Sequence, residues 1–173
     1  MKLILENWRK YLNEEIQDKY QIFLDMDGVL SDFDGAITKQ CGSKKEWADD
    51  WSKLPSNFFE NLPKLPDADL LVDYARGLFD IHVLTAIPKR GKYDGARVQK
   101  FKWCLNHFKI YPSRVHVCFW EEKQYFAVEE NLSPNLLIDD NEKNVAAFKT
   151  KGGIAILHTS AENSIKELQQ LGF

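Results

Sequence analysis

The sequence predicts an α/β protein in which a parallel sheet lies between layers of helices. Two patterns along the 173 residues predict this class. Short apolar segments recur along the chain, and several are nearly continuously apolar, as strands buried on both faces are. Helical patterns separate most of these segments, and strands that alternate with helices favour a parallel sheet.

Five predicted strands are rich in aliphatic and aromatic residues, and their lengths suit strands. They are 21–24 (QIFL), 80–85 (DIHVLT), 114–119 (RVHVCF), 135–139 (NLLID) and 153–157 (GIAIL).

One helix is predicted ahead of the second strand, and another is predicted between the second and third strands. Residues 67–76 begin after Pro66 and end before Gly77, which are good start and stop signals. Residues 95–108 carry apolar side chains on one face, namely Val98, Phe101, Leu105 and Phe108. Two further helices are expected at 141–149 and 160–171, with Asp140 and Ser160 as N-caps.

Two segments stand apart from this alternation. Residues 1–20 are expected to hold an amphipathic helix that packs on the domain, with partner binding as the alternative. Residues 31–65 show no clear strand and are rich in aromatic residues, so we expect a small helical cap above the strand ends. The α/β core then comprises 21–30 and 66–173.

Composition narrows the classes of function. The net charge of −3 argues against broad, charge-driven binding to nucleic acid or anionic membrane. Cys41, Cys104 and Cys118 lie far apart in the sequence and have no metal-binding spacing, so we expect reduced thiols. The four histidines have no metal-binding spacing either. Acidic residues close to the N-terminus count against a signal peptide, and no apolar run approaches the ~20 residues of a membrane span. A cytoplasmic protein is expected.

Polar residues follow four of the predicted strands. They are Asp25 and Asp27, then Thr85, then Lys123, and finally Asp139 with Asp140. In open parallel sheets, ligands bind outside the carboxyl ends of the strands. Oxygen ligands suit Mg²⁺, and a carboxylate nucleophile, a hydroxyl donor and an ammonium group together suit a phosphoryl group.

Each of these residues alone has a simpler explanation. Asp27 with Gly28 is typical of a turn, Thr85 of a strand, and Lys123 of a solvated helix start. Asp139 with Asp140 is typical of a helix cap. A single site explains all four positions together, so the catalytic interpretation is favoured.

The same segments resemble a known superfamily. DMDGVL at 25–30, VLT at 83–85, Lys123 and LLIDD at 136–140 are similar, in order and context, to the four motifs of the haloacid dehalogenase superfamily. The resemblance covers residues 21 to about 158. It implies a Rossmann-like three-layer core with a cap inserted after the first strand.

The resemblance also implies roles for these residues. Asp25 would attack phosphorus, and Asp27 would protonate the leaving alcohol and then activate water. Thr85 would bind the phosphoryl oxygens, and Lys123 would offset their charge. Mg²⁺ would be held by the Asp25 carboxylate, the Asp27 backbone carbonyl and Asp140, with Asp139 in reserve. An acid two residues after the nucleophile goes with phosphatases and phosphomutases in this superfamily.

A closer resemblance concerns the substrate. DMDGVLSDF at 25–33, NFFENLPKLP at 57–66 and TAIPK at 85–89 are similar to the 5'(3')-deoxyribonucleotidase family. It implies that Phe33 packs against the base and that cap aromatics complete the pocket, with Trp51 the best match and Trp47 next. Packing of a small helical subdomain is the alternative for these rings.

Two departures from that family stand in this sequence. The insertion between Leu30 and Asn57 looks shorter than the usual cap, and Ala86 replaces a serine that contacts phosphate. A basic run from Lys89 to Lys102 follows Thr85. It is either a solvated helix face or a surface that attracts anionic substrates.

The expected function is Mg²⁺-dependent hydrolysis of (deoxy)nucleoside monophosphates. Another small phosphate ester or a nucleic-acid terminal phosphate is the first alternative, and a non-catalytic phosphate- or nucleotide-binding module is the second. The expected partner is a small phosphate ester and not a membrane, and nucleic acid is less favoured. The oligomeric state stays open, a homodimer included.

Overall fold

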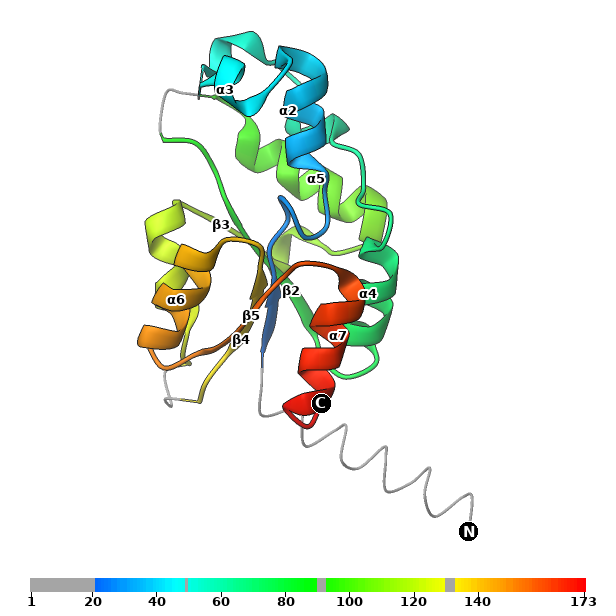
Figure 1. The fold of residues 1–173 in the computed structure, drawn as a ribbon, viewed down its shortest axis with the longest axis vertical. Helices are drawn as coiled ribbons and strands as arrows, with labels where there is room; N and C mark the ends of the chain where they lie inside the picture. Colours follow the sequence, from blue (N-terminus) through cyan, green and yellow to red (C-terminus); the bar gives the residue numbers. More distant parts are fainter. Residues whose placement is uncertain (1–20, 49, 90–92, 130–132) are drawn as a thin grey trace.

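The structure is a computed structural model that describes residues 21–48, 50–89, 93–129 and 133–173. Residues 1–20, where the sequence predicts an amphipathic helix, lie outside the described residues. Figure 1 shows a central sheet covered by helices on both sides. No helix among the described residues is long and apolar enough to cross a membrane.

The sheet has five parallel strands in the order β3-β2-β1-β4-β5. They are β1 (Ile22–Leu24), β2 (Ile81–Ala86), β3 (Val115–Cys118), β4 (Leu136–Asp139) and β5 (Ile154–Leu157). The predicted α/β class with a three-layer parallel sheet is therefore confirmed. Leu24 of the central strand pairs with Val83 and with Ile138. This register brings the carboxyl ends of β1, β2 and β4 to one edge.

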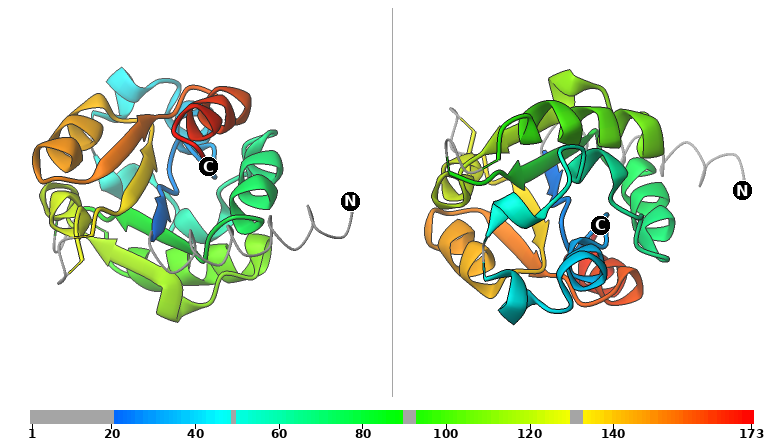
Figure 2. Two further views of the ribbon diagram at one scale, coloured as in Figure 1. Left: turned by 90° about the horizontal axis from the view of Figure 1, so that it is seen from below. Right: turned by 90° about the horizontal axis from the view of Figure 1, so that it is seen from above.

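Alternate residues of β1 face opposite layers, as the two-residue period of a strand requires. Ile22 and Leu24 belong to one apolar cluster and Phe23 to another. The first cluster contains residues of α4 (Ala68–Arg76), α5 (Ala96–Phe108) and α7 (Ala161–Gln170), and the second contains residues of α6 (Glu142–Thr150) and η4 (Trp120–Phe126). Figure 2 shows α6 and η4 on one side of the sheet and α4 and α7 on the other.

The helix ends agree with the start and stop signals predicted from the sequence, except at the start of α6. Ser160 caps α7 by accepting a hydrogen bond from the Asn163 amide, and Gly77 follows α4. The prediction that Asp140 caps α6 is wrong, because Asn141 accepts from the Lys143 amide instead. The Asp140 carboxylate is consequently not used in capping.

The face of α5 that packs on the protein is only partly the predicted apolar one. Val98 is 55% exposed, whereas Gln99 and Lys100 are buried. Gln99 turns inward because it bonds backbone groups of the preceding segment: its Oε1 accepts from the Phe59 amide, and its Nε2 donates to the Ser56 carbonyl. A helix can bury polar side chains when such partners are available.

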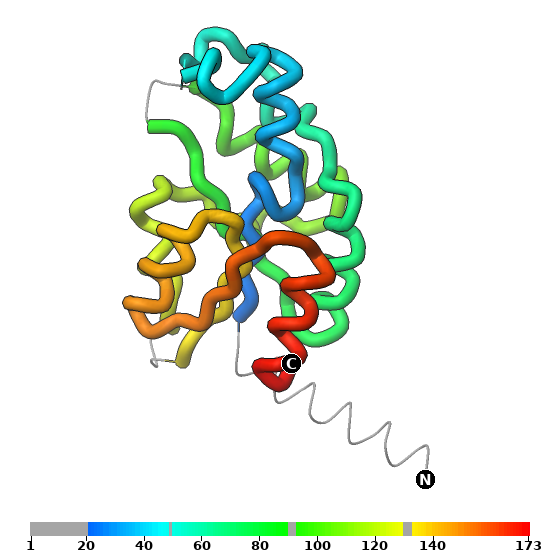
Figure 3. The backbone as a smooth tube through the Cα atoms, viewed as in Figure 1, coloured from blue at the N-terminus to red at the C-terminus, as the bar shows by residue number. Residues whose placement is uncertain are grey.

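The segment between the first strand and α4 is helical. Its elements are α2 (Phe33–Cys41), α3 (Lys44–Trp47), η1 (Trp51–Lys53) and η2 (Phe59–Asn61), and the described residues of the segment form no strand. Figures 1 and 3 show α2 and α3 above the carboxyl ends of the strands. The Phe33 ring packs edge-on against Trp47 and Phe58, with centroids 5.8 and 5.7 Å away. We call this segment, residues 31–65, the cap.

Candidate active site

The loop after β1 places two aspartates on either side of the fully buried Met26. The Asp25 amide donates to the Ile138 carbonyl, and Asp25 Oδ1 accepts from the Met26 amide at 2.7 Å. The amides of Leu30 and Ser31 both donate to the Met26 carbonyl, which closes the turn. Both carboxylates line one cavity. The doublet therefore belongs to a single site.

Gly28 allows this loop to approach β4. Its φ of +82° is a left-handed conformation that side chains other than glycine rarely adopt. A Cβ atom at this position would lie 2.1 Å from Asp140 Oδ2. The glycine is required both by the turn and by the carboxylate beside it.

Lys123 joins the first and fourth strand ends. Its Nζ lies 2.6 Å from Asp25 Oδ2 and 2.7 Å from Asp139 Oδ2, and the side chain is only 2% exposed. Burial by itself lowers the pKa of Lys123, but the two carboxylates raise it above its ordinary value. The lysine is therefore a buried ammonium group and not a solvated one.

Asp139 and Asp140 differ in what surrounds them. Asp139 is fully buried and accepts from Lys123, from the Asn141 amide and from Asn144 Nδ2. No side chain of a described residue donates to the Asp140 carboxylate, which lines the cavity. Burial and the neighbouring Asp139 raise the pKa of Asp140 to about 6. Asp140 is consequently the carboxylate with free lone pairs.

The acidic cluster fits a divalent cation. Carboxylate oxygens of Asp25, Asp139 and Asp140 lie within 4.8 Å of one another. Burial raises the pKa of Asp25, with further contributions from Asp139 and Asp27, while Lys123 opposes the shift. Four carboxylates, those three and Asp27, lie at this site, and among the described residues their ion pairs are with two ammonium groups, those of Lys100 and Lys123, so the carboxylates outnumber the ammonium groups that they contact directly. An all-oxygen site with this excess suits Mg²⁺ or a similar hard cation.

Lys100 is a site residue that sequence reasoning missed. Its Nζ donates to Asp27 Oδ2 at 2.6 Å and to Thr85 Oγ1 at 2.7 Å. The side chain is fully buried and its ammonium lies 4.8 Å from the centre of the Phe59 ring. Its sequence context, the basic run between Lys89 and Lys102, is typical of a solvated helix face, and only the inward rotation of α5 distinguishes it.

The hydrogen bond from Lys100 also holds the side chain of Thr85 in place. Its side chain is fully buried and does not line either of the two cavities described below. Because Lys100 donates to its hydroxyl oxygen, the hydroxyl hydrogen stays available for another acceptor. Ala86, one residue further, lines both cavities.

Two adjoining cavities form the site. The first, about 400 Å³, contains Asp25, Asp27, Lys123 and Asp140. The second, about 770 Å³, is lined by rings of the cap and by the chain after β2. Six residues line both: Asp27, Phe33, Lys44, Ala86, Trp120 and Asn141. We call the two the acidic cavity and the aromatic cavity, and together they make one continuous cleft.

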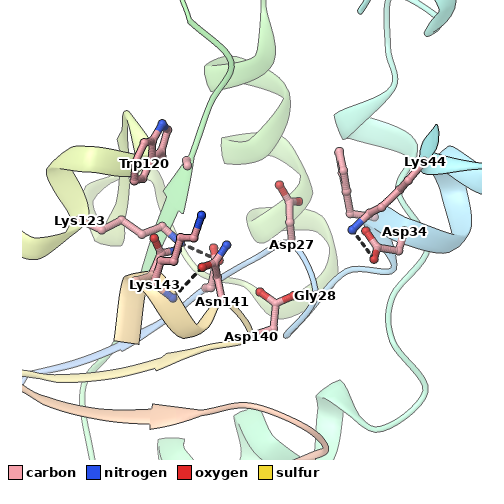
Figure 4. Close-up of a pocket in the computed structure, with 13 residues that line it drawn as sticks. Asp27, Gly28, Asp34, Lys44, Trp120, Lys123, Asp140, Asn141 and Lys143 are labelled. Atoms are coloured by element: carbon pink, nitrogen blue, oxygen red, sulfur yellow. Dashed lines mark hydrogen bonds and ion pairs between the residues drawn. The ribbon is translucent and has the colours of Figure 1, made fainter. Parts of the chain in front are cut away.

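Each predicted substrate residue lies along this cleft. Phe33, Trp47, Trp51, Ala86 and Lys89 line the aromatic cavity. Figure 4 shows residues that the sequence did not single out in the acidic cavity, among them Trp120, Asn141 and Lys143, and also the ion pair of Lys44 with Asp34. Their only sequence signal was their nearness to Lys123, Asp140 and Phe33.

Neither the models of known protein families nor the curated proteins give a match to this sequence. Among solved structures, the fold is similar to that of a hydrolase from Streptococcus pneumoniae TIGR4. The TM-score is 0.53 at 17% identity, and the similarity covers 87% of this chain and 99% of that chain. At this identity the likeness establishes the fold.

Proposed function

We propose that this protein is a Mg²⁺-dependent phosphomonoesterase of the haloacid dehalogenase superfamily that hydrolyses (deoxy)nucleoside monophosphates. The observation that carries the proposal is that Asp25 and Asp27 line one cavity with Lys123 and Asp140. The similarity in fold to a protein described as a hydrolase supports it. So does the resemblance of the four strand-end motifs to that superfamily.

In the first half of the proposed reaction, an Asp25 carboxylate oxygen attacks phosphorus and the ester oxygen leaves. Asp27 gives that oxygen a proton, so an alcohol and an aspartyl-phosphate form. Lys123, which bonds Asp25 Oδ2, orients the nucleophile through this contact. Its positive charge also offsets the negative charge that collects on the phosphoryl oxygens.

In the second half, Asp27 takes a proton from water, and the water oxygen attacks phosphorus. The bond to Asp25 breaks, which releases inorganic phosphate and restores both carboxyl groups. Lys100 and Ser31 hold the two oxygens of Asp27, at 2.6 and 3.2 Å. These contacts orient the carboxyl group that acts in both halves.

Mg²⁺ would be held by Asp25, Asp140 and the backbone carbonyl of Asp27. Bound there, it would supply positive charge to the phosphoryl oxygens. Asp139 is a poorer ligand because Lys123, Asn141 and Asn144 already occupy its lone pairs. We therefore assign Asp139 to positioning of Lys123, and Asp140 to the metal.

The aromatic cavity supports a substrate with a ring. Phe33, Trp51 and Phe59 line it, and stacking on such side chains stabilises a bound base by about 1–3 kcal/mol. The exposed ammonium groups of Lys44 and Lys89 lie at the same cavity, the first paired with Asp34 and the second 4.0 Å from Glu121. A nucleoside monophosphate fits both cavities, with phosphate in the acidic one and base in the aromatic one.

The test is phosphate release from nucleoside monophosphates, sugar phosphates and oligonucleotides with 3'- or 5'-terminal phosphate. Each is assayed with Mg²⁺ and with EDTA, and Asp25→Asn is the control. Preference for nucleoside monophosphates, lost with EDTA and in the variant, supports the proposal. Full activity of Asp25→Asn would refute the mechanism.

Another phosphate ester, including a nucleic-acid terminal phosphate, is the second candidate. The observation in its favour is that the exposed side chains of Lys44 and Lys89 lie at the cleft, where a longer anion would extend. Release from oligonucleotides alone would select it. Binding of phosphate esters without release of phosphate would instead select a non-catalytic module.

A further inference from the structure

We propose that Trp120 is a specificity-determining residue whose indole ring receives a planar ring of the substrate's leaving group. In this arrangement Trp120 forms the core-side wall of the cleft, and the cap rings Phe33, Trp51 and Phe59 form the other. The proposal rests on the proposed function, because it concerns the same cleft. It adds a contact from η4, outside the cap.

Trp120 lies where the two cavities meet. It lines the acidic cavity with Asp25 and Lys123, and it lines the aromatic cavity with Trp51 and Phe59. Figure 4 shows Trp120 on the side of Lys123 and Lys44 of α3 on the opposite side, with Asp27 between them. A ring attached to a phosphoryl group at Asp25 would therefore lie between Trp120 and the cap residues that line both cavities, Phe33 and Lys44.

The ring of Trp120 is exposed and available. It is 53% exposed, and among the described residues no aromatic ring packs against it. A single exposed aromatic side chain is common on protein surfaces, and what distinguishes Trp120 is that it lines both cavities. Tyr125 of the same η4 is 69% exposed but lines neither cavity, so exposure of aromatics in η4 is not by itself a property of the site.

The backbone that carries Trp120 is fixed by its neighbours. The Phe119 amide donates to Glu122 Oε2 at 2.8 Å, and the Glu122 amide donates to the Phe119 carbonyl at 2.9 Å. Three residues after Trp120, Lys123 is anchored to Asp25 and Asp139. The backbone beneath the Trp120 ring is therefore held in place, and only the side chain has to be ordered when a ligand stacks on it.

The chemistry of the cavity selects the kind of group. Besides the rings, the aromatic cavity is lined by the apolar Ala86, Ile87 and Pro88. These surfaces favour a flat, weakly polar ring, such as a nucleobase or an aryl group, over a polyol. A sugar phosphate would use the acidic cavity but would gain little from Trp120.

The experiment compares a ring substrate with a ringless one. The ratio kcat/KM is measured for a deoxynucleoside 5'-monophosphate and for ribose 5-phosphate, in wild type, Trp120→Ala, Trp120→Phe and Tyr125→Ala. We expect Trp120→Ala to lower kcat/KM for the nucleotide about tenfold, within the range for loss of one stacking ring. The value for ribose 5-phosphate should be unchanged, Trp120→Phe should restore most of the nucleotide value, and Tyr125→Ala should change neither.

Two results would overturn the proposal. Equal losses on both substrates would mean that Trp120 only supports the turn that carries Lys123. No loss on either would mean that the ring does not contact the substrate.

A binding measurement separates this proposal from the proposed function. Calorimetry measures the affinity of the same nucleotide for Asp25→Asn and for Asp25→Asn combined with Trp120→Ala. If wild type releases no phosphate from either ester, the proposed function fails, and binding still decides on Trp120. About tenfold weaker binding without the indole supports the proposal, whereas equal affinity or no binding to Asp25→Asn overturns it.

Discussion

The ammonium group of Lys100 lies 2.6 Å from the Asp27 carboxylate, and the lysine side chain is fully buried. The same group donates to Thr85, so one side chain of α5 connects the ends of β1 and β2. The Phe59 ring of the cap covers it. Lys100 thus fixes the position of the proposed acid/base from below the cap.

Replacement of Lys100 by Met should lower kcat at least about 100-fold, because a general acid/base contributes about 10²–10⁴-fold when it is correctly held. The melting temperature should also fall, because Asp27 loses its buried partner. Lys102→Met is the matched control on the same helix. Lys102 is 54% exposed and pairs with Glu60 at the surface, where such pairs contribute about 0–1 kcal/mol. A fully active Lys100→Met would contradict the assignment.

Gly28→Ala tests the close approach of the first loop to β4. The substitution adds left-handed strain of about 1–2 kcal/mol and a contact with Asp140 Oδ2. Gly172→Ala is the control, because its φ is +94° but no atom lies within 4 Å of the added Cβ. We expect Gly28→Ala to lower the melting temperature more than Gly172→Ala and to weaken Mg²⁺ binding. Equal shifts in the two variants would show that Asp140 moves aside without cost.

Removal of the side-chain charge at Asp139 and at Asp140 should have opposite effects on the stability of the protein. Asp140→Asn removes a carboxylate to which no described side chain donates and whose pKa is raised by burial and by Asp139, so the protein without metal should keep or gain stability. Its melting temperature should no longer rise when Mg²⁺ is added. Asp139→Asn breaks the buried contact with Lys123 and should cost about 3–5 kcal/mol. Thermal unfolding with Mg²⁺ and with EDTA measures both, and a normal Mg²⁺ shift in Asp140→Asn would transfer the metal assignment to Asp139.

The sheet could be predicted because its strands are buried on both faces. The segments around Phe23, Val83 and Leu137 are apolar at successive positions, and such segments have few other places in a folded chain. The strand-end carboxylates followed from the same reasoning, since parallel strands bring their carboxyl ends to one edge. The cap at 31–65 was anticipated as helical, and its limits as a domain stay a prediction.

Other features depend on tertiary contacts that the sequence does not display. Lys100 lies within a basic run, and it is buried only because Gln99 bonds the backbone of residues 56 and 59 and so rotates α5 inward. Asn141 caps α6 where Asp140 was expected, because both residue types cap helices and only the position of the site separates them. The sequence did not single out Trp120, and only its place in the lining of both cavities connects it with the site.

A last prediction concerns His82 and His116, which have no metal-binding spacing in the sequence. His82 Nδ1 lies 2.8 Å from His116 Nε2, and the two rings stack with centroids 5.1 Å apart. Gln21 bonds the other nitrogen of His82. Burial lowers the pKa of both histidines below 6.5, and His116 lowers that of His82 further. The charged neighbours Asp80 and Glu129 act against these shifts, and Arg114 adds to that of His82.

In the folded protein, the pKa values of His82 and His116 lie below 6.5. Once the pH falls below about 6.5, the unfolded chain therefore binds more protons than the folded protein does. The contribution of this pair to stability is therefore fully present above that pH and is lost as the pH falls toward the folded values. We expect the melting temperature of wild type to drop between pH 7 and pH 5, by about 2–4 °C for each kcal/mol lost. His82→Gln combined with His116→Gln should show a smaller drop, and His107→Gln, whose ring belongs to another cluster beside Trp103, should retain most of it. Identical pH profiles for wild type and the double variant would assign the acid sensitivity to other groups.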